Sequence, residues 1–312
     1  MTLDSVDRPG GLMETHTPLV SFVLATMNRS EDLRKCLNSI FAQSYPRMEV
    51  LVVDNASTDD TAEMVKLEFP QVQLINLPEN KGAGGGKSVA LSAACGEYIV
   101  QLDDDETLPQ SDVGQRVVEC FRANPEVGVL SFNILDTHTG LTAQRTVPRR
   151  DKRVQAEDSE CGYFLGGGCA FRKEVVGEVG IYWDQLNPYG SEEFDLSLRI
   201  LQAGYQILWT ESIYIYHYES PSARPSWRRT YSETRNRPWV ALRHLPWVYV
   251  LSHFVCWWGY GALLAARSRE WGAYLKGLKD CMAGVPKVYR SRKVVGRSVI
   301  KTLRRCSGPL YY

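Results

Sequence analysis

Three adjacent aspartates, Asp103, Asp104 and Asp105, directly follow an apolar run at residues 97–102. Like charges held this close raise one another's pKa, so such a cluster is costly without a cation. A hard divalent ion, Mn²⁺ or Mg²⁺, binds carboxylate oxygens and can hold a diphosphate at the same time. The alternative is an acidic turn in solvent, which the preceding buried-strand pattern disfavours. The sequence therefore predicts a metal site at this turn.

Two further groups could join this chemistry. Glu192 and Glu193 begin a predicted helix, where the helix dipole favours the ionised form that a general base requires. From these residues alone, ordinary first-turn acidity remains the simpler explanation. His217 ends a strand-like run and by itself is more often structural, but beside a metal it becomes a candidate ligand, better suited to Mn²⁺ than to Mg²⁺.

The stretch NKGAGGGKS at residues 80–88 resembles a phosphate-binding P-loop. Gly86, Lys87 and Ser88 fit the end of that pattern, but Lys81 stands where its first glycine is required. A P-loop NTPase is therefore disfavoured, and we expect a glycine loop with another function. Lys87 could meet a diphosphate as a point charge, or it could be a solvated lysine at a helix start.

These groups must be positioned by the elements around them. Apolar runs predict four strands, separated by segments with helical periodicity, at residues 19–25, 49–54, 72–77 and 97–102. Repeated β-α units of this kind predict an α/β fold with a mostly parallel, doubly covered sheet. Ligands bind such sheets beyond the carboxyl ends of the strands. Polar segments follow all four strands, so we expect them to converge at one edge.

The C-terminal part differs from the rest. The whole chain has zero formal net charge, but residues 222–312 contain 18 Lys and Arg against three acidic residues. This basic tail indicates a polyanionic partner, either nucleic acid or anionic lipid, or else a solvated basic face. The eight cysteines show no CxxC pair and are interpreted as reduced thiols of a cytosolic protein. Residues 1–17 have no apolar core of a signal peptide and are interpreted as a flexible leader.

Within the tail, residues 247–266 lack any formally charged side chain. At about 1.5 Å per residue a helix of this length could cross about 30 Å of hydrocarbon. Arg243 precedes it and Arg267 and Arg269 follow it, whereas a single span favours basic residues on one side only. We therefore expect a helix in the membrane interface, with a span or a buried soluble helix as alternatives.

Taken in order, three blocks of this sequence resemble family-2 glycosyltransferases with the GT-A fold. They are residues 20–61, residues 80–108, which lead into a D-x-D motif, and residues 190–207, which hold the acceptor-side motif. The run TRNRPWVALRHLP at residues 234–246 resembles the rhamnosyltransferase-like subset that makes bacterial cell-surface polysaccharides. The resemblance implies a GT-A domain at 18–221 and a basic, Trp-rich, membrane-associating helical extension at 222–312.

The resemblance also implies roles for single residues. Asp54 is expected to bind the donor's pyrimidine base, with Thr26 and Arg29 lining that pocket. Asp103 and Asp105 would engage the metal and the nucleotide, Asp104 the ribose or sugar, and His217 would complete the metal site. The glycine loop that begins at Gly82 would let the backbone approach the donor and close when it binds. Glu193 stands where the family has a catalytic Asp, with Glu192 as the alternative base.

The predicted reaction is a metal-dependent, inverting transfer of a sugar from a UDP- or dTDP-sugar, dTDP-rhamnose among them. The acceptor would be a hydroxyl of a lipid-linked or growing cell-surface glycan. The metal and nearby cations would neutralise the leaving diphosphate, and the enzyme would act at the cytoplasmic face of the plasma membrane without binding nucleic acid. Two alternatives are a sugar-phosphate nucleotidyltransferase and a nucleic-acid-binding protein that uses the basic tail.

Overall fold

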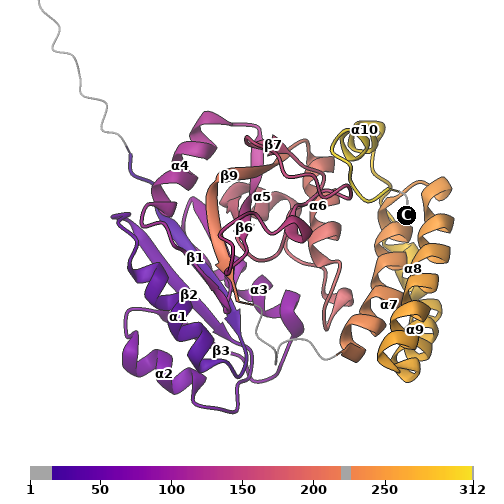
Figure 1. Ribbon diagram of the computed structural model, residues 1–312, viewed down its shortest axis with the longest axis horizontal. Helices are drawn as coiled ribbons and strands as arrows, with labels where there is room; N and C mark the ends of the chain where they lie inside the picture. The colour runs from indigo at the N-terminus through magenta and orange to yellow at the C-terminus, as the bar shows by residue number, and fades with distance from the viewer. Residues whose placement is uncertain (1–15, 219–225, 311–312) are drawn as a thin grey trace, which may run out of the picture.

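The computed structural model describes residues 16–218 and 226–310 (Figure 1). Its strands are β1 (Val20–Thr26), β2 (Met48–Asp54), β3 (Gln73–Asn76), β4 (Tyr98–Asp103), β5 (Glu106–Thr107), β6 (Val127–Leu135), β7 (Ser159–Glu160), β8 (Cys169–Arg172) and β9 (Gln206–His217). Its α-helices are α1 (Ser30–Phe41), α2 (Thr61–Glu68), α3 (Gly82–Ala93), α4 (Val113–Ala123), α5 (Lys173–Val179), α6 (Glu192–Ala203), α7 (Ser226–His244), α8 (Trp247–Ser268), α9 (Trp271–Arg290) and α10 (Arg297–Arg305). The leader predicted at residues 1–17 falls almost wholly outside the described residues.

The nine strands form one sheet in the order β3-β2-β1-β4-β8-β6-β9-β5, with β7 paired to β9. The first four strands run parallel to one another, as the β-α pattern predicts. In the second half, β8 is antiparallel to both of its neighbours, and β5 and β7 are antiparallel to β9. The α/β fold class is therefore confirmed, but the sheet is mixed rather than mostly parallel.

Helices cover both faces of the sheet. Successive side chains of a strand point to opposite faces, and in this sheet the side chains on both faces are apolar and must be buried. In β1, Val23 packs into the cluster that contains residues of α3 and α6. Its neighbours Phe22 and Leu24 pack into the opposite cluster, which contains residues of α1 and α4. The strands are therefore apolar on both sides, which explains why their sequences are continuous apolar runs.

The expected glycine loop is instead the first two turns of helix α3, which begins at Gly82. Gly82 has a φ of +75° there, and a Cβ on it would lie 2.8 Å from Asn187 Oδ1. A Cβ on Gly86 would lie 3.0 Å from the Cβ of Ala25 at the end of β1. The glycines thus let α3 pack closely against its neighbours, and the prediction of a loop was wrong.

The C-terminal helices α7, α8 and α9 pack side by side and meet the sheet half of the molecule through α6 (Figure 1). The boundary predicted at residues 221 and 222 falls in the segment 219–225, which is outside the described residues. Helix α8 is long and apolar enough to cross a membrane by length and composition. However, Tyr249, Val250, His253, Gly261 and Ala265 on one side of α8 are buried within the protein.

Candidate active site

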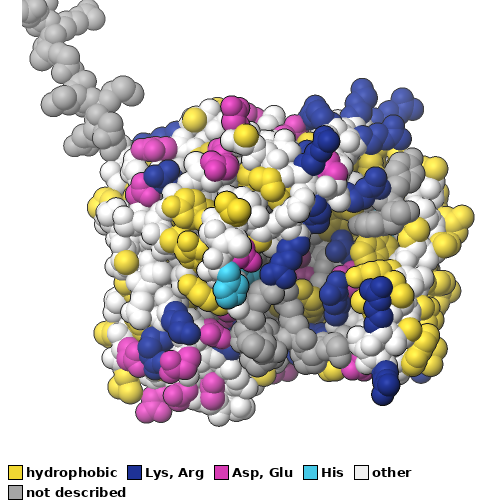
Figure 2. Space-filling view, viewed as in Figure 1, with side chains coloured by type: hydrophobic (Ala, Val, Ile, Leu, Met, Phe, Trp, Pro, Cys, Tyr) yellow, Lys and Arg dark blue, Asp and Glu magenta, His cyan; other side chains and the backbone are white. Residues whose placement is uncertain are grey.

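A cleft of about 680 Å³ lies at the carboxyl ends of β1 and β4, between the sheet and the helical extension. Figure 2 shows the hollow, with Lys and Arg side chains gathered at its edge. Nearly all residues predicted for the site line it, namely Thr26, Arg29, Gly82, Lys87, Asp103, Asp104, Asp105, Glu192, Glu193 and His217. Its described lining does not include Asp54, whose Oδ1 accepts the Ser57 amide at 3.0 Å. The neighbouring Asn55 lines the cleft instead.

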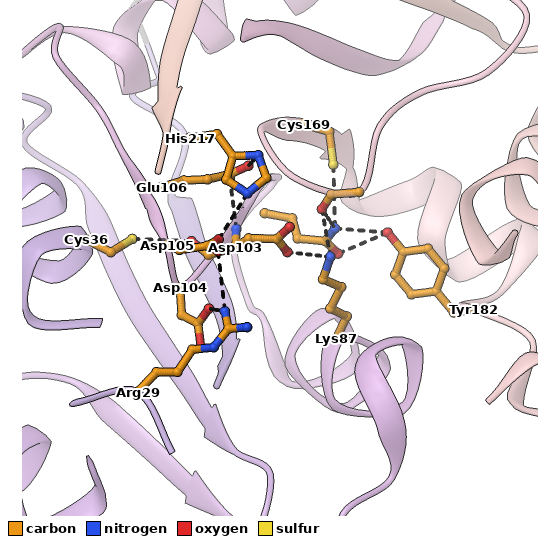
Figure 3. Close-up of polar contacts among 12 residues, drawn as sticks. Arg29, Cys36, Lys87, Asp103, Asp104, Asp105, Glu106, Cys169, Tyr182 and His217 are labelled. Carbon is orange, nitrogen blue, oxygen red and sulfur yellow. Dashed lines mark hydrogen bonds and ion pairs between the residues drawn. The ribbon is translucent and has the colours of Figure 1, made fainter. Parts of the chain in front are cut away.

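Asp104 is buried in the turn after β4 and contacts two other predicted donor-binding residues, of which Figure 3 shows Arg29. Thr26 Oγ1 donates to Asp104 Oδ2 at 2.7 Å, and the Arg29 guanidinium pairs with Oδ1. Burial raises the pKa of Asp104 to about 6 although Arg29 and Thr26 oppose that shift. Asp104 therefore ties the acidic turn to the end of β1 and the start of α1.

Asp105 lies between two cationic groups, Arg29 and His217. Its Oδ2 is 3.5 Å from Arg29 NH1, and its Oδ1 is 3.2 Å from His217 Nε2. Burial lowers the pKa of His217, but the hydrogen bond and charge of the surrounding carboxylates outweigh it and raise the pKa to about 9. Two of the predicted metal ligands, Asp105 and His217, are thus in contact with each other.

A cluster of possible metal ligands that includes Glu106 was not predicted from the sequence. Asp103, Glu106 and His217 each offer one ligand atom, and these atoms lie within 4.8 Å of one another. Glu106 is fully buried, and its Oε1 has no hydrogen-bond partner among the described residues. A buried carboxylate oxygen left in this state suits a divalent cation, so the residues fit a metal ion. The signal was present as the fourth acid of the run DDDE.

The glycines at 166–168 allow this packing. A Cβ on Gly167 would overlap Glu106 Oε1 and lie 3.0 Å from Asp103 Oδ2. A Cβ on Gly166 would overlap the Glu193 carboxylate. The segment after β7 therefore lies against both the acidic turn and Glu193 of α6, whereas its sequence, FLGGGCAF at residues 164–171, suggests only a strand or a tight loop.

Lys87 reaches from α3 into the floor of the cleft (Figure 3). Its Nζ lies 2.6 Å from Asp103 Oδ1 and donates to the carbonyl of Gly166 at 3.0 Å. Burial lowers the pKa of Lys87, but the charges of Asp103 and Glu193 outweigh it and the pKa is raised. Lys87 is therefore a buried, paired cation, and its interpretation as a solvated lysine is wrong.

The two carboxylates at the start of α6 differ in their surroundings. Glu192 is 3% exposed, and its Oε2 has no hydrogen-bond partner among the residues that the structure describes. Burial and the adjacent charge of Glu193 raise the pKa of Glu192 to about 8. Burial also raises the pKa of Glu193, but the charge of Lys87 opposes that shift. Glu192 is thus the more deeply buried of the two, and burial favours its neutral form.

One cleft thus holds both the acidic turn after β4 and the two carboxylates at the start of α6. Residues 21–180 match the sequence model of "Glycosyl transferase family 2". The chain belongs to this family, as its three sequence blocks predict.

The chain is similar to curated bacterial enzymes. It is 29% identical to a "Poly-beta-1,6-N-acetyl-D-glucosamine synthase" of Staphylococcus epidermidis, over 53% of this chain and 42% of that protein. It is 27% identical to the protein of the same name from Staphylococcus aureus (strain COL), over 60% of this chain and 47% of that protein. The chain thus spans less than half the length of these relatives.

Solved structures share the fold over most of the chain. S. aureus TarS in complex with UDP-GlcNAc superposes with a TM-score of 0.62 at 19% identity, covering 88% of this chain and 84% of that one. The mannosyltransferase PcManGT from Pyrobaculum calidifontis, in complex with GDP-Man and Mn²⁺, gives 0.57 at 21% identity, covering 93% and 80%. These similarities confirm the predicted fold.

Proposed function

We propose that this glycosyltransferase is a metal-dependent, inverting enzyme that uses a nucleoside-diphosphate sugar as donor. The observation that carries the proposal is one cleft holding both a metal-capable cluster and the Glu193 carboxylate. Structural neighbours bind UDP-GlcNAc or GDP-Man, one of them with Mn²⁺, which supports a sugar nucleotide and a metal. Family membership removes the reasons for the nucleotidyltransferase and P-loop alternatives.

Glu193 is the better candidate for the general base. Glu192 is buried, and burial favours its protonated form, in which it cannot accept a proton, whereas Glu193 is only half-buried. Glu193 lines the cleft and lies within the field of Lys87, which favours its ionised form. In the proposed reaction Glu193 takes the proton of an acceptor hydroxyl, which attacks the anomeric carbon from the face opposite the leaving group.

The metal, Mn²⁺ or Mg²⁺, would be held by Asp103, Glu106 and His217. Asp105 lies next to this cluster because its carboxylate contacts the His217 ring. When bound, it supplies positive charge that stabilises the leaving diphosphate. Thr26 and Arg29 fix Asp104 on the donor side of the cleft, and Asn55 lines that side in place of Asp54. We propose a UDP- or dTDP-sugar as donor and a lipid-linked or growing glycan as acceptor, consistent with the polysaccharide synthases among the relatives.

A direct test compares the wild type with Glu193→Gln. A panel of UDP-GlcNAc, UDP-glucose and dTDP-rhamnose is scored for hydrolysis with Mn²⁺ or Mg²⁺, and UDP binding is measured by calorimetry. We expect Glu193→Gln to retain UDP affinity and to lose about 100-fold or more of turnover, the usual contribution of a general base. Wild-type turnover in this variant would remove Glu193 from the mechanism.

We further propose that the extension binds the membrane surface through the outer face of α8 and α9. Val248 (70% exposed), Leu251 (72%) and Val255 (64%) form one apolar stripe on α8. On α9 the exposed apolar side chains include Trp271, Leu275, Met282 and Tyr289. The basic residues of the extension complement an anionic leaflet.

The contacts of α8 support a helix that lies flat rather than one that spans. The side of α8 that faces the protein contacts arginines of two neighbouring helices. The guanidinium of Arg237 on α7 lies 4.7 Å from the Trp257 ring centroid, and Arg304 of α10 donates a hydrogen bond to Tyr249 Oη at 2.8 Å. A spanning α8 would carry these arginines into hydrocarbon, which is costly. The same helices at an interface keep their polar side on the protein.

Liposome flotation tests this contact. Vesicles of phosphatidylglycerol and phosphatidylcholine should bind the wild type, and Leu251→Glu combined with Leu275→Glu should abolish binding. Leu67→Glu on α2 is the matched control, because Leu67 is 73% exposed but lies in the sheet half. Binding to a DNA or RNA duplex in a gel shift, without flotation, would favour the nucleic-acid alternative instead.

A further inference from the structure

Helix α7 contacts the segment just before the α6 carboxylates. The Asn236 side-chain amide donates at 2.8–2.9 Å to the backbone carbonyls of Leu186, Tyr189 and Gly190. The neighbouring Arg235 guanidinium donates to the carbonyls of Gln185 and Asn187. Asn236 is fully buried, so these bonds are shielded from water. The loop 185–190, which ends two residues before Glu192, is therefore held by α7.

Helix α7 also contacts the segment just after those carboxylates. Asp195 is fully buried, and its Oδ1 accepts hydrogen bonds from Arg243 at 2.6 Å and from His244 Nε2 at 2.8 Å. Its Oδ2 accepts from Arg199 Nε of α6 at 3.0 Å. Burial alone would raise the pKa of Asp195, but the His244 bond and these charges lower it to about 2. Asp195 thus stays ionised and joins α6 to α7.

The groups that bind Asp195 are themselves fixed. The Arg243 guanidinium lies 4.0 Å from the ring centroid of Trp183, and His244 Nδ1 faces the carbonyl of Lys293 at 3.2 Å. Arg199 also donates to the carbonyl of Ile181 at 2.6 Å. Because each partner has a second anchor, the position of Asp195 is set by the extension and not by α6 alone.

The two contacts lie on one side of α7, because Asn236 and Arg243 are seven residues, or about two turns, apart. Along the chain they enclose Glu192 and Glu193, which lie between Gly190 and Asp195. We propose that α7 positions the general base, with Asp195 and Asn236 as positioning residues that hold the α6 carboxylates toward the cleft. This inference rests on the proposed function. The contacts lie beyond residues 21–180, which carry the family match.

The test uses the full-length chain and separates misfolding from misplacement. Asp195→Asn and Asn236→Ala are compared with the wild type for UDP binding with Mn²⁺ by calorimetry and for hydrolysis of the sugar nucleotide that the wild type turns over. Turnover is divided by the number of UDP-binding sites, so a fraction of unfolded protein does not change it. We expect UDP affinity within twofold of the wild type and turnover per site at least about tenfold lower, since a displacement of 1 Å can cost more.

Two further variants keep the test decisive if Asp195→Asn does not fold. His244→Gln retains a donor toward Asp195 and should keep most of the turnover per site, whereas His244→Leu should lose it. Arg229→Met is the control, because Arg229 is exposed, donates to Tyr260 Oη at 2.9 Å between α7 and α8, and has no described contact with α6 or with the loop 185–190.

Turnover per site at the wild-type level in both Asp195→Asn and His244→Leu would overturn the inference. A similar loss in Arg229→Met would also overturn it, because it would show that any damage to the extension has the same effect. A wild type that neither binds UDP nor hydrolyses a sugar nucleotide would instead refute the proposed function, and the inference with it.

Discussion

Replacing Lys87 by Met should destabilise the metal-free protein and leave the metal-loaded protein much less affected. Lys87 Nζ lies 2.6 Å from Asp103 Oδ1, and the two side chains are only 9% and 21% exposed. Removing one partner of a buried pair costs about 3–5 kcal/mol, because the remaining charge is left uncompensated. At about 2–3 °C per kcal/mol, the Tm in EDTA should fall by roughly 6–15 °C.

A divalent cation at Asp103, Glu106 and His217 would compensate the same carboxylate. A metal at 100 times its Kd stabilises the folded state by about 2.7 kcal/mol, and the variant should bind it more tightly than the wild type. Differential scanning fluorimetry with EDTA and with Mn²⁺ therefore should show a larger Mn²⁺-induced rise in Tm for Lys87→Met.

Lys66→Met is the control for this experiment, because Lys66 is exposed on α2 and its loss should change neither Tm. An unchanged Tm of Lys87→Met in EDTA would refute the importance of the Lys87–Asp103 pair. An identical Mn²⁺-induced rise in both proteins would refute the placement of the metal beside Asp103.

Three other results are expected. Because the pKa of Glu192 is raised to about 8, the folded protein binds more protons than the unfolded chain between pH 4.5 and 8, and the free energy of unfolding should fall as pH rises through that window. Urea unfolding of Glu192→Gln at pH 5.5 and 8 should show a weaker dependence on pH than the wild type. An unchanged pH dependence would contradict the role of Glu192. Glu106→Gln should weaken Mn²⁺ binding at least tenfold by calorimetry, and unchanged affinity would exclude it as a ligand. Gly167→Ala should abolish Mn²⁺-dependent turnover, because its Cβ would overlap Glu106, whereas Gly177→Ala, with open space around it, should not.

Much of the first half of the fold could be predicted from local pattern. Buried parallel strands are continuous apolar runs, so β1, β2 and β4 were placed to within one residue at either end. Their carboxyl ends must then lie together, which brought the predicted polar segments to one cleft. The mixed second half of the sheet was not predicted, because β5, β7 and β8 have only two to four residues and carry no readable periodicity.

The details of the site depended on contacts between residues far apart in sequence. Lys87 pairs with Asp103 because α3 packs beside β1, and the side chain of a helix-start lysine gives no sign of that partner. Asp54 and Asn55 are neighbours, and only the path of the chain after β2 decides which side chain faces the cleft. The glycines within residues 82–86 are compatible with a loop and with a tightly packed helix, and only the positions of the neighbouring segments distinguish the two.

The sequence by itself determined the family, the α/β class, the acidic turn after β4 and the candidate base at the start of α6. These features depend on residue types within a few positions of one another, which a linear pattern preserves. Tertiary structure alone decided that Glu106 joins Asp103 and His217, that Lys87 is buried, and that α7 holds both ends of the segment around Glu193. Those contacts arise from the packing of whole elements, whose relative placement no local periodicity encodes.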